Sequence, residues 1–224
     1  MRRLAVGVGV AVVVAAAVAL VIELGGISGA TGSPTARATG ARTVQTVLRP
    51  VHADGTPAPG YRVTIESVQG FTCDEGASPS AVDPDIRVCG FTALNTLSCW
   101  RSTGHTVLCL RDAYTRSLVR IRYTGTFAHV AAPIRPAPQG LTLTTGAHCH
   151  IRDGGAWDSV VSHPTWVGAY WCATTSLYGP PGGYGIDSSV MPWLVHEVSG
   201  VSGNGTQRVV DRRVARAFFV GTAT

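Results

Sequence analysis

Six cysteines that follow a strongly apolar N-terminus constrain the fold of this 224-residue chain more than any other feature. Residues 4–22 form an unbroken apolar run behind Arg2 and Arg3. A helix of that length reaches ~28 Å, close to the thickness of the hydrocarbon core of a bilayer. The run is either a signal peptide cleaved near Ala30 or a single membrane anchor, and its length favours the anchor. Both alternatives place the rest of the chain outside the cytoplasm.

An even number of cysteines in an exported chain indicates disulfides rather than free thiols. Their spacing alone leaves every pairing open. The six positions are Cys73, Cys89, Cys99, Cys109, Cys149 and Cys172.

The composition indicates a globular, turn-rich β protein, because 45% of the residues are hydrophobic, 14% are charged and 27 are glycine. The net charge of +5 is modest and includes Arg2 and Arg3. We therefore expect no nucleic-acid partner.

The chain divides into four predicted regions. Residues 1–25 form the signal peptide or transmembrane helix, and residues 26–60 form a flexible stalk rich in Gly, Pro and Thr, within which 44–51 could form a short strand. A proline-rich join at 131–140 separates a first β-rich lobe, 61–134, from a second, 135–224. We predict an all-β, mainly antiparallel, disulfide-stapled fold in two small lobes, plus one N-terminal hydrophobic helix. Strands are expected near 61–68, 106–110, 117–123, 141–151, 166–173, 193–198 and 208–220.

Two catalytic motifs begin in this sequence but are not completed. The Thr144–Cys149 segment resembles the surroundings of a serine protease histidine, but Asp187-Ser188-Ser189 lacks the glycines of an oxyanion hole. His196-Glu197 starts a zinc-protease motif, but Gly200 stands where the second histidine belongs. We expect a non-enzymatic protein without a cofactor.

His148 and His150 flank Cys149 and would share one face of a strand, opposite the cysteine. The main hypothesis is that they are surface or half-buried side chains. The minority hypothesis is half of a metal site, completed by His163, His105, His129 or an acidic residue. The alternative function is a cell-envelope hydrolase or metal-dependent enzyme around His148, His150, Asp153 and Asp158.

Two further sets of residues are candidates for binding. Arg120 and Arg122 share a strand face and could bind an anionic polymer, although a solvated face is the simpler interpretation. Tyr178 and Tyr184 lie in a Gly/Pro-rich segment and are the better candidates for ligand contact, whereas Trp166 or Trp193 is expected in the core.

Eight short blocks carry a family pattern: Cys73–Ala77, Asp83–Cys89, Leu97–Trp100, Val107–Leu110, Gly140–Cys149, Tyr170–Cys172, Tyr178–Pro180 and Met191–Trp193. Their spacing resembles an uncharacterised six-cysteine family of exported, secreted or membrane-anchored proteins of high-GC Gram-positive bacteria. The chain departs from the family pattern at Asp74, where the family has tryptophan, and lacks the Asp-Pro before Cys99.

The resemblance implies a disulfide pairing. It makes the Gly146–Cys149 and Tyr170–Cys172 segments neighbouring strands with Cys149 bonded to Cys172. A hairpin through Ser102–Gly104 then suggests Cys99–Cys109 and leaves Cys73 for Cys89. The resemblance implies no activity. We expect a cell-envelope binding or interaction module, tethered through the N-terminal helix or secreted, with an envelope polymer or a protein as its partner.

Overall fold

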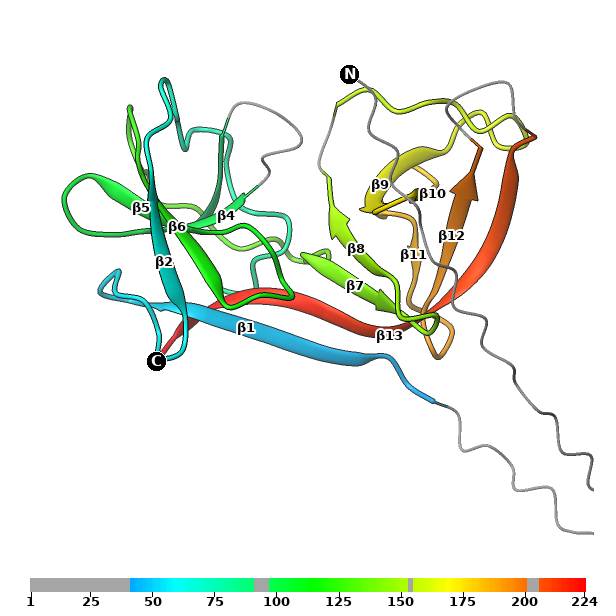
Figure 1. Ribbon diagram of the computed structural model, residues 1–224, viewed down its shortest axis with the longest axis horizontal. Coiled ribbons are helices and arrows are strands. Elements are labelled where there is room, and N and C mark those ends of the chain that lie inside the picture. The colour runs from blue at the N-terminus through cyan, green and yellow to red at the C-terminus, as the bar shows by residue number, and fades with distance from the viewer. Residues whose placement is uncertain (1–40, 91–96, 153–154, 201–205) are drawn as a thin grey trace, which may run out of the picture. The chain divides into compact units, whose positions relative to one another are not determined.

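The computed structural model describes residues 41–90, 97–152, 155–200 and 206–224, which belong to one compact unit, Ala38–Thr224. The described residues form strands and loops but no helix. The strands make an eight-stranded and a five-stranded sheet, mostly antiparallel. Figure 1 shows their arrangement. The all-β prediction is confirmed, and the expected N-terminal helix lies outside the described residues.

The eight-stranded sheet closes on itself through the long strand β13 (Arg208–Ala223). Residues 208–213 of β13 pair with β12, and residues 214–218 pair with β7, so β7-β8-β9-β10-β12-β13 form a closed barrel. Its interior is apolar, with Leu141, Tyr170 and Val195 fully buried. The other strands of this sheet are β1 (Val44–His52), β7 (Gly140–Leu143), β8 (His148–Ile151), β9 (Val167–Cys172), β10 (Thr175–Gly179), β11 (Ile186–Asp187) and β12 (Leu194–Ser199).

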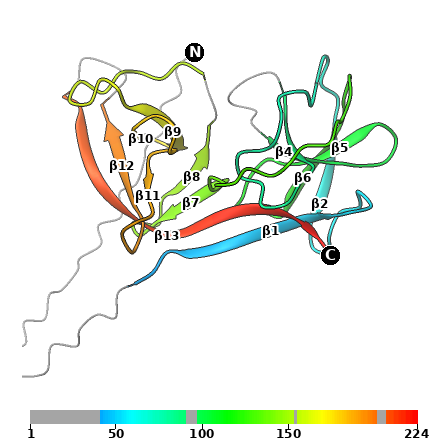
Figure 2. The ribbon, with the colours of Figure 1, turned by 180° about the vertical axis from the view of Figure 1, so that it is seen from behind.

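Strand β1 corrects the predicted stalk. It pairs in parallel with residues 216–223 of β13, and the two strands run side by side in Figures 1 and 2. Val51 is fully buried, while Val44 and Val47 stay exposed. The stalk prediction is therefore wrong for residues 41–60, because a strand at the edge of a sheet keeps a polar, half-exposed composition that resembles a linker. Residues 26–40 lie outside the described residues.

The five-stranded sheet falls entirely within the predicted first lobe, 61–134. Its strand order is β2 (Arg62–Glu66), β6 (Ser117–Arg122), β5 (Thr106–Leu110), β4 (Leu97–Arg101) and β3 (Ile86–Cys89). Apolar side chains cover both faces, because Val107 and Cys109 join one buried cluster while Leu108 and Leu110 join another. The second cluster also contains Val51 of β1 and Val220 of β13. This sheet is thus packed on both sides.

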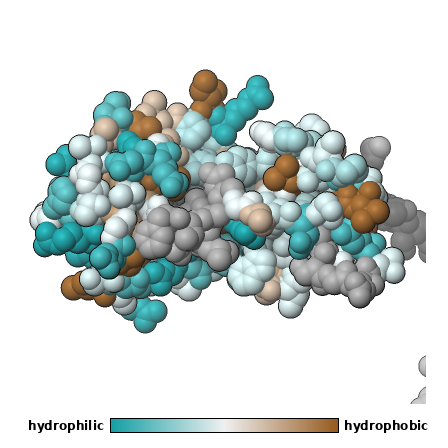
Figure 3. Space-filling view, turned by 90° about the horizontal axis from the view of Figure 1, so that it is seen from above, coloured by the Kyte–Doolittle hydropathy of each residue, from teal (hydrophilic) through white to brown (hydrophobic). Residues whose placement is uncertain are grey.

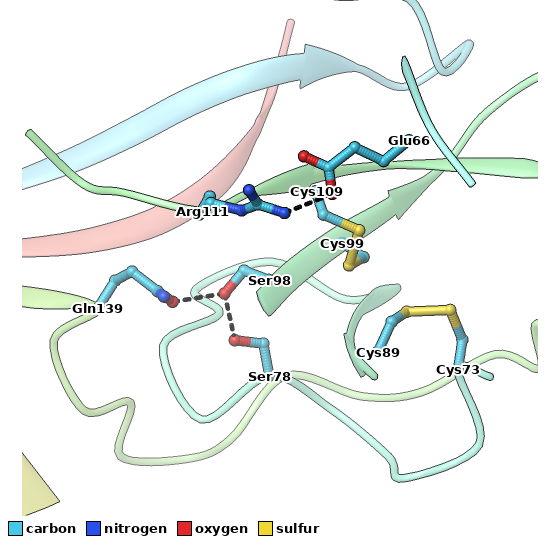
Figure 4. Close-up of a disulfide and its surroundings, with 9 residues drawn as sticks. All are labelled: Glu66, Cys73, Ser78, Cys89, Ser98, Cys99, Cys109, Arg111 and Gln139. Carbon is cyan, nitrogen blue, oxygen red and sulfur yellow. Dashed lines mark hydrogen bonds and ion pairs between the residues drawn. A yellow bond between two sulfur atoms is a disulfide. The ribbon is translucent and has the colours of Figure 1, made fainter. Parts of the chain in front are cut away.

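Three disulfides staple the fold, and the described residues contain no free cysteine. The predicted disulfide bonding is confirmed, and the pairs agree with those that the resemblance implied. Cys99 and Cys109 lie directly opposite each other on β4 and β5, as Figure 4 shows. Cys73 is bonded to Cys89 and Cys149 to Cys172.

A buried polar network ties the first sheet to the segment that leads into the barrel. The Ser98 hydroxyl donates to the Gln139 side-chain carbonyl at 2.6 Å, and it lies 2.6 Å from the Ser78 hydroxyl (Figure 4). All three residues are at least nine-tenths buried. Because a buried polar group without a partner is costly, this network favours one arrangement of the join.

The predicted single strand 141–151 is two strands. β7 and β8 form a hairpin whose turn, Thr144–Ala147, places Gly146 at a positive φ of 87°. Glycine adopts this conformation without steric cost, so the residue that the sequence pattern assigned to a strand instead makes the turn. The short strands β3, β10 and β11 were not predicted, and β4 was implied only by the hairpin through Ser102–Gly104.

Candidate binding site on the outer face of the barrel

A pocket of about 350 Å³ lies beside β9, β10 and the end of β12. We call it the Trp171 pocket. Its lining combines three aromatic rings with hydroxyl and charged groups. The residues used below are Arg152, Trp157, Asp158, Trp171, Ser176 and Tyr178.

Trp171 is placed by the alternation of β9. Its neighbours Tyr170 and Cys172 are buried in the barrel, so Trp171 points outward and remains 51% exposed. His150 of β8 and Ser176 of β10 lie directly opposite it on the adjoining strands. These three side chains therefore form a row across the outer face of the sheet.

Trp157 lies flat against the backbone of β9 at Gly168. A Cβ atom at Gly168 would come within 2.0 Å of the indole Cε3, so only glycine leaves room for the ring. The Arg152 guanidinium lies over the same indole, 4.4 Å from the ring centroid, and its Nη2 donates to the Ala156 carbonyl at 3.1 Å. Stacking of a cation on a ring fixes both groups, so this side of the pocket is preorganised.

Tyr178 forms the buried side of the pocket rather than an exposed ligand contact. It is 2% exposed, and its ring meets Trp157 edge-on with 5.6 Å between ring centroids. Burial raises the pKa of Tyr178, Asp158 raises it further and Arg152 opposes the shift. The prediction that Tyr178 lies in a Gly/Pro-rich loop is wrong, because the residue belongs to β10 and its side chain packs with Val160 and Val198.

Tyr184 lies elsewhere. Its φ of 51° is in the left-handed region, and its half-buried ring packs against the barrel core. It lines two other pockets, of about 450 and 270 Å³. The first of these shares Arg152 with the Trp171 pocket, so the two predicted tyrosines lie in neighbouring pockets rather than in one.

The two tryptophans considered for the core differ. Trp193 is 7% exposed inside the barrel, as expected. Trp166 is only partly buried and stacks between His163 and His196, with ring centroids 3.8 and 4.6 Å away.

His148 and His150 share the outer face of β8, with Cys149 buried between them. Both pack on Tyr114, His148 face to face at 3.9 Å and His150 edge-on at 5.1 Å. Burial lowers the pKa of His150, although Asp112, 4.0 Å from its Nδ1, opposes that shift. His148, His150 and Tyr114 therefore form one aromatic cluster, which the sequence pattern did not predict.

Tyr114 joins the loop after β5 to the barrel. Its hydroxyl lies 2.7 Å from the Leu141 carbonyl and 2.8 Å from the Cys149 carbonyl, and it accepts the Cys149 N–H at 3.2 Å. A Cβ atom at Gly140 would come within 2.9 Å of this hydroxyl. Burial raises the pKa of Tyr114, which keeps the hydroxyl protonated as a donor.

The structure does not complete the metal hypothesis. Among the described residues, no group of three or more His, Cys, Asp or Glu side chains is placed to hold a metal ion. The suggested third ligands have other contacts, since His105 stacks on Tyr123, His129 pairs with Asp85 and His163 stacks on Trp166.

The residues of the enzyme alternative do not converge either. Asp158 lines the Trp171 pocket, whereas His148 lines a separate one beside Tyr114. Asp153 lies outside the described residues.

Arg120 and Arg122 lie on β6 of the five-stranded sheet, which contributes nothing to the Trp171 pocket. Arg120 donates to the hydroxyls of Ser102 and Thr106 at 2.9 and 3.2 Å. Arg122 is exposed. The structure therefore does not bring these arginines together with the aromatic candidates.

No family model, curated protein or solved structure matches this chain. Within the described part of the chain, no helix is long and apolar enough to cross a membrane. The apolar run at residues 4–22 lies outside that part.

Proposed function

We propose that this protein is an extracytoplasmic binding module of the cell envelope, tethered through its N-terminal apolar segment or released from it, with the Trp171 pocket as its ligand site. The observation that carries the proposal is the half-exposed Trp171 beside a preorganised pocket. A pocket lined by aromatic rings and a few polar groups is typical of a ligand site, and the half-exposed tryptophan offers it an apolar ring with a polar N–H.

The compartment is supported by the cysteines. All six are oxidised, and structural disulfides persist in exported proteins but are rare in reducing compartments. The apolar run after Arg2 and Arg3 supplies a route to that compartment.

One face of the molecule lacks the broad apolar patch of a docking interface. On the face that Figure 3 shows, strongly hydrophobic residues are scattered among polar and neutral ones. A protein-docking surface built on apolar contact would gather them in one patch.

The test of this proposal uses the full chain and isolated cell-wall sacculi. Cell fractionation with alkylation before and after reduction should find the chain in the envelope or medium, with thiols that react only after reduction. The purified chain should sediment with sacculi, Trp171→Ala should reduce the bound fraction about tenfold, and Val161→Ala, at an exposed residue outside the pocket, should leave it unchanged. Cytosolic chain with reactive thiols, or equal sedimentation of both variants, contradicts the proposal.

A further inference from the structure

We infer that the Trp171 pocket and the adjoining His150 bind a stretch of polysaccharide, with one sugar ring stacked on Trp171. This inference rests on the proposed function, since it names the ligand class of the same site. Its basis is the pairing of aromatic faces with side chains that both donate and accept hydrogen bonds.

A pyranose ring has an apolar face of C–H groups and a rim of hydroxyls. Trp171 offers a half-exposed indole face for stacking. Around it the pocket supplies the Arg152 guanidinium as a donor, the Asp158 carboxylate as an acceptor and the Ser176 hydroxyl as both. Sugar hydroxyls donate and accept, so this mixed lining satisfies them.

The same lining disfavours other ligand classes. The Asp158 carboxylate opposes a polyanion such as a nucleic acid, whose phosphates need neighbouring cations without a competing acid. An apolar peptide segment would leave the polar groups of the pocket without hydrogen-bond partners. A neutral, hydroxyl-rich ligand avoids both costs.

The site is longer than one sugar. His150, Trp171 and Ser176 lie in register on three adjoining strands, β8, β9 and β10. Neighbouring strands lie ~4.8 Å apart, so the row spans about 10 Å across the sheet. His150 lies beside Trp171 but does not line the pocket, and it is held edge-on against Tyr114. A chain of sugars that crosses the strands meets both rings, so affinity should increase with ligand length.

Calorimetric titration of the full chain tests the inference, with N-acetylglucosamine and its dimer to hexamer, glucose oligomers and penta-alanine as probes. At least one sugar series should bind, and its trimer should bind about tenfold more tightly than its monomer. Trp171→Ala should weaken the trimer about tenfold, whereas Trp171→Phe should keep part of the affinity. His150→Gln should weaken the hexamer but not the monomer. Val161→Ala, at an exposed apolar residue outside the pocket, is the matched control.

The outcomes separate the ligand class from the proposed function. If sacculi bind in a Trp171-dependent way but neither sugar series binds or competes, the polysaccharide inference is wrong and the binding module stands. If penta-alanine alone binds, the ligand class is a peptide and the inference is also wrong. If neither sacculi nor soluble sugars bind, both proposals are wrong. Equal affinity for monomer and hexamer contradicts the extended site.

Discussion

The barrel and the five-stranded sheet carry the same kind of cross-strand disulfide but differ in which of their faces are buried. Each carries a disulfide between directly neighbouring strands, Cys149–Cys172 in the barrel and Cys99–Cys109 in the sheet. The sheet is covered on both faces, and Trp100 and Tyr123 are each 3% exposed. The barrel has its core inside and turns Trp171 outward. A closed barrel therefore frees its outer face for a ligand, whereas an open sheet needs both faces for packing.

Removal of each cross-strand disulfide in turn should have the largest effect on stability and should separate the roles of the two regions. Each double variant, Cys149→Ala with Cys172→Ala or Cys99→Ala with Cys109→Ala, should lower the free energy of unfolding by about 3 kcal/mol. The paired cysteines are 23 and 10 residues apart, and the stabilisation by a disulfide grows only with the logarithm of loop length. Only the barrel variant should also weaken sacculus binding, since that disulfide adjoins Trp171. Urea titration and sedimentation measure the two effects. Equal loss of binding in both variants contradicts a division of roles.

Gly168→Ala should disturb the pocket directly. The new Cβ would overlap the Trp157 indole, so the ring must move away from Arg152 and β9. We expect a loss of about 1–3 kcal/mol in unfolding free energy together with weaker binding, measured by urea titration and sedimentation. Gly183→Ala is the matched control, because no atom lies within 4 Å of its Cβ position. An unchanged Gly168→Ala variant would show that Trp157 is not fixed there.

Tyr114→Phe tests the contact between the two regions. The variant keeps the ring against His148 but leaves the Cys149 N–H and two carbonyls without the hydroxyl. We expect the free energy of unfolding to fall by about 1–2 kcal/mol, measured by urea titration. Tyr123→Phe, at a buried ring that stacks on His105 beside the five-stranded sheet, serves as a comparison. No difference from the native chain would mean that the hydroxyl contributes nothing.

The smallest expected effect is the pH dependence of folding stability, which we attribute to His150 in the barrel. The pKa of His150 is lowered in the folded protein, mainly by burial, so the unfolded chain binds more protons near its ordinary pKa. Stability should therefore fall as pH decreases through ~6.5, and it should level off below the folded pKa. Thermal melts from pH 8 to 5 measure this, and His150→Gln should flatten part of the slope. An identical slope in the variant contradicts the assignment to His150.

Local patterns in the sequence were sufficient to predict the strands with clear boundaries. Alternation predicted Thr106–Leu110 as observed, and Ser117–Tyr123 to within one residue. It also placed the two histidines opposite Cys149. The position and facing of these residues depend only on their neighbours along the chain, because alternate side chains of a strand point to opposite faces.

The site depended on contacts that no local pattern contains. Tyr114 joins β7 and β8 from 27 and 35 residues away, and nothing around it marks that role. Arg152 and Gly168 matter because Trp157 packs on both. Glycine beside aromatic residues on a strand was the available signal for such packing. The possible strand at 44–51 was placed in a stalk rather than in a sheet, because its partner, β13, lies at the other end of the chain.

The indole N–H signals of the five tryptophans test the central claim most directly. In a ¹H–¹⁵N spectrum of the full chain, assigned with Trp→Phe variants, a sugar hexamer should shift the signals of Trp157 and Trp171. The signals of Trp100 and Trp193, buried in the sheet and in the barrel, should stay in place. Shifts confined to Trp100 or Trp193, or no shift at saturating sugar, would contradict a ligand site on the outer face of the barrel.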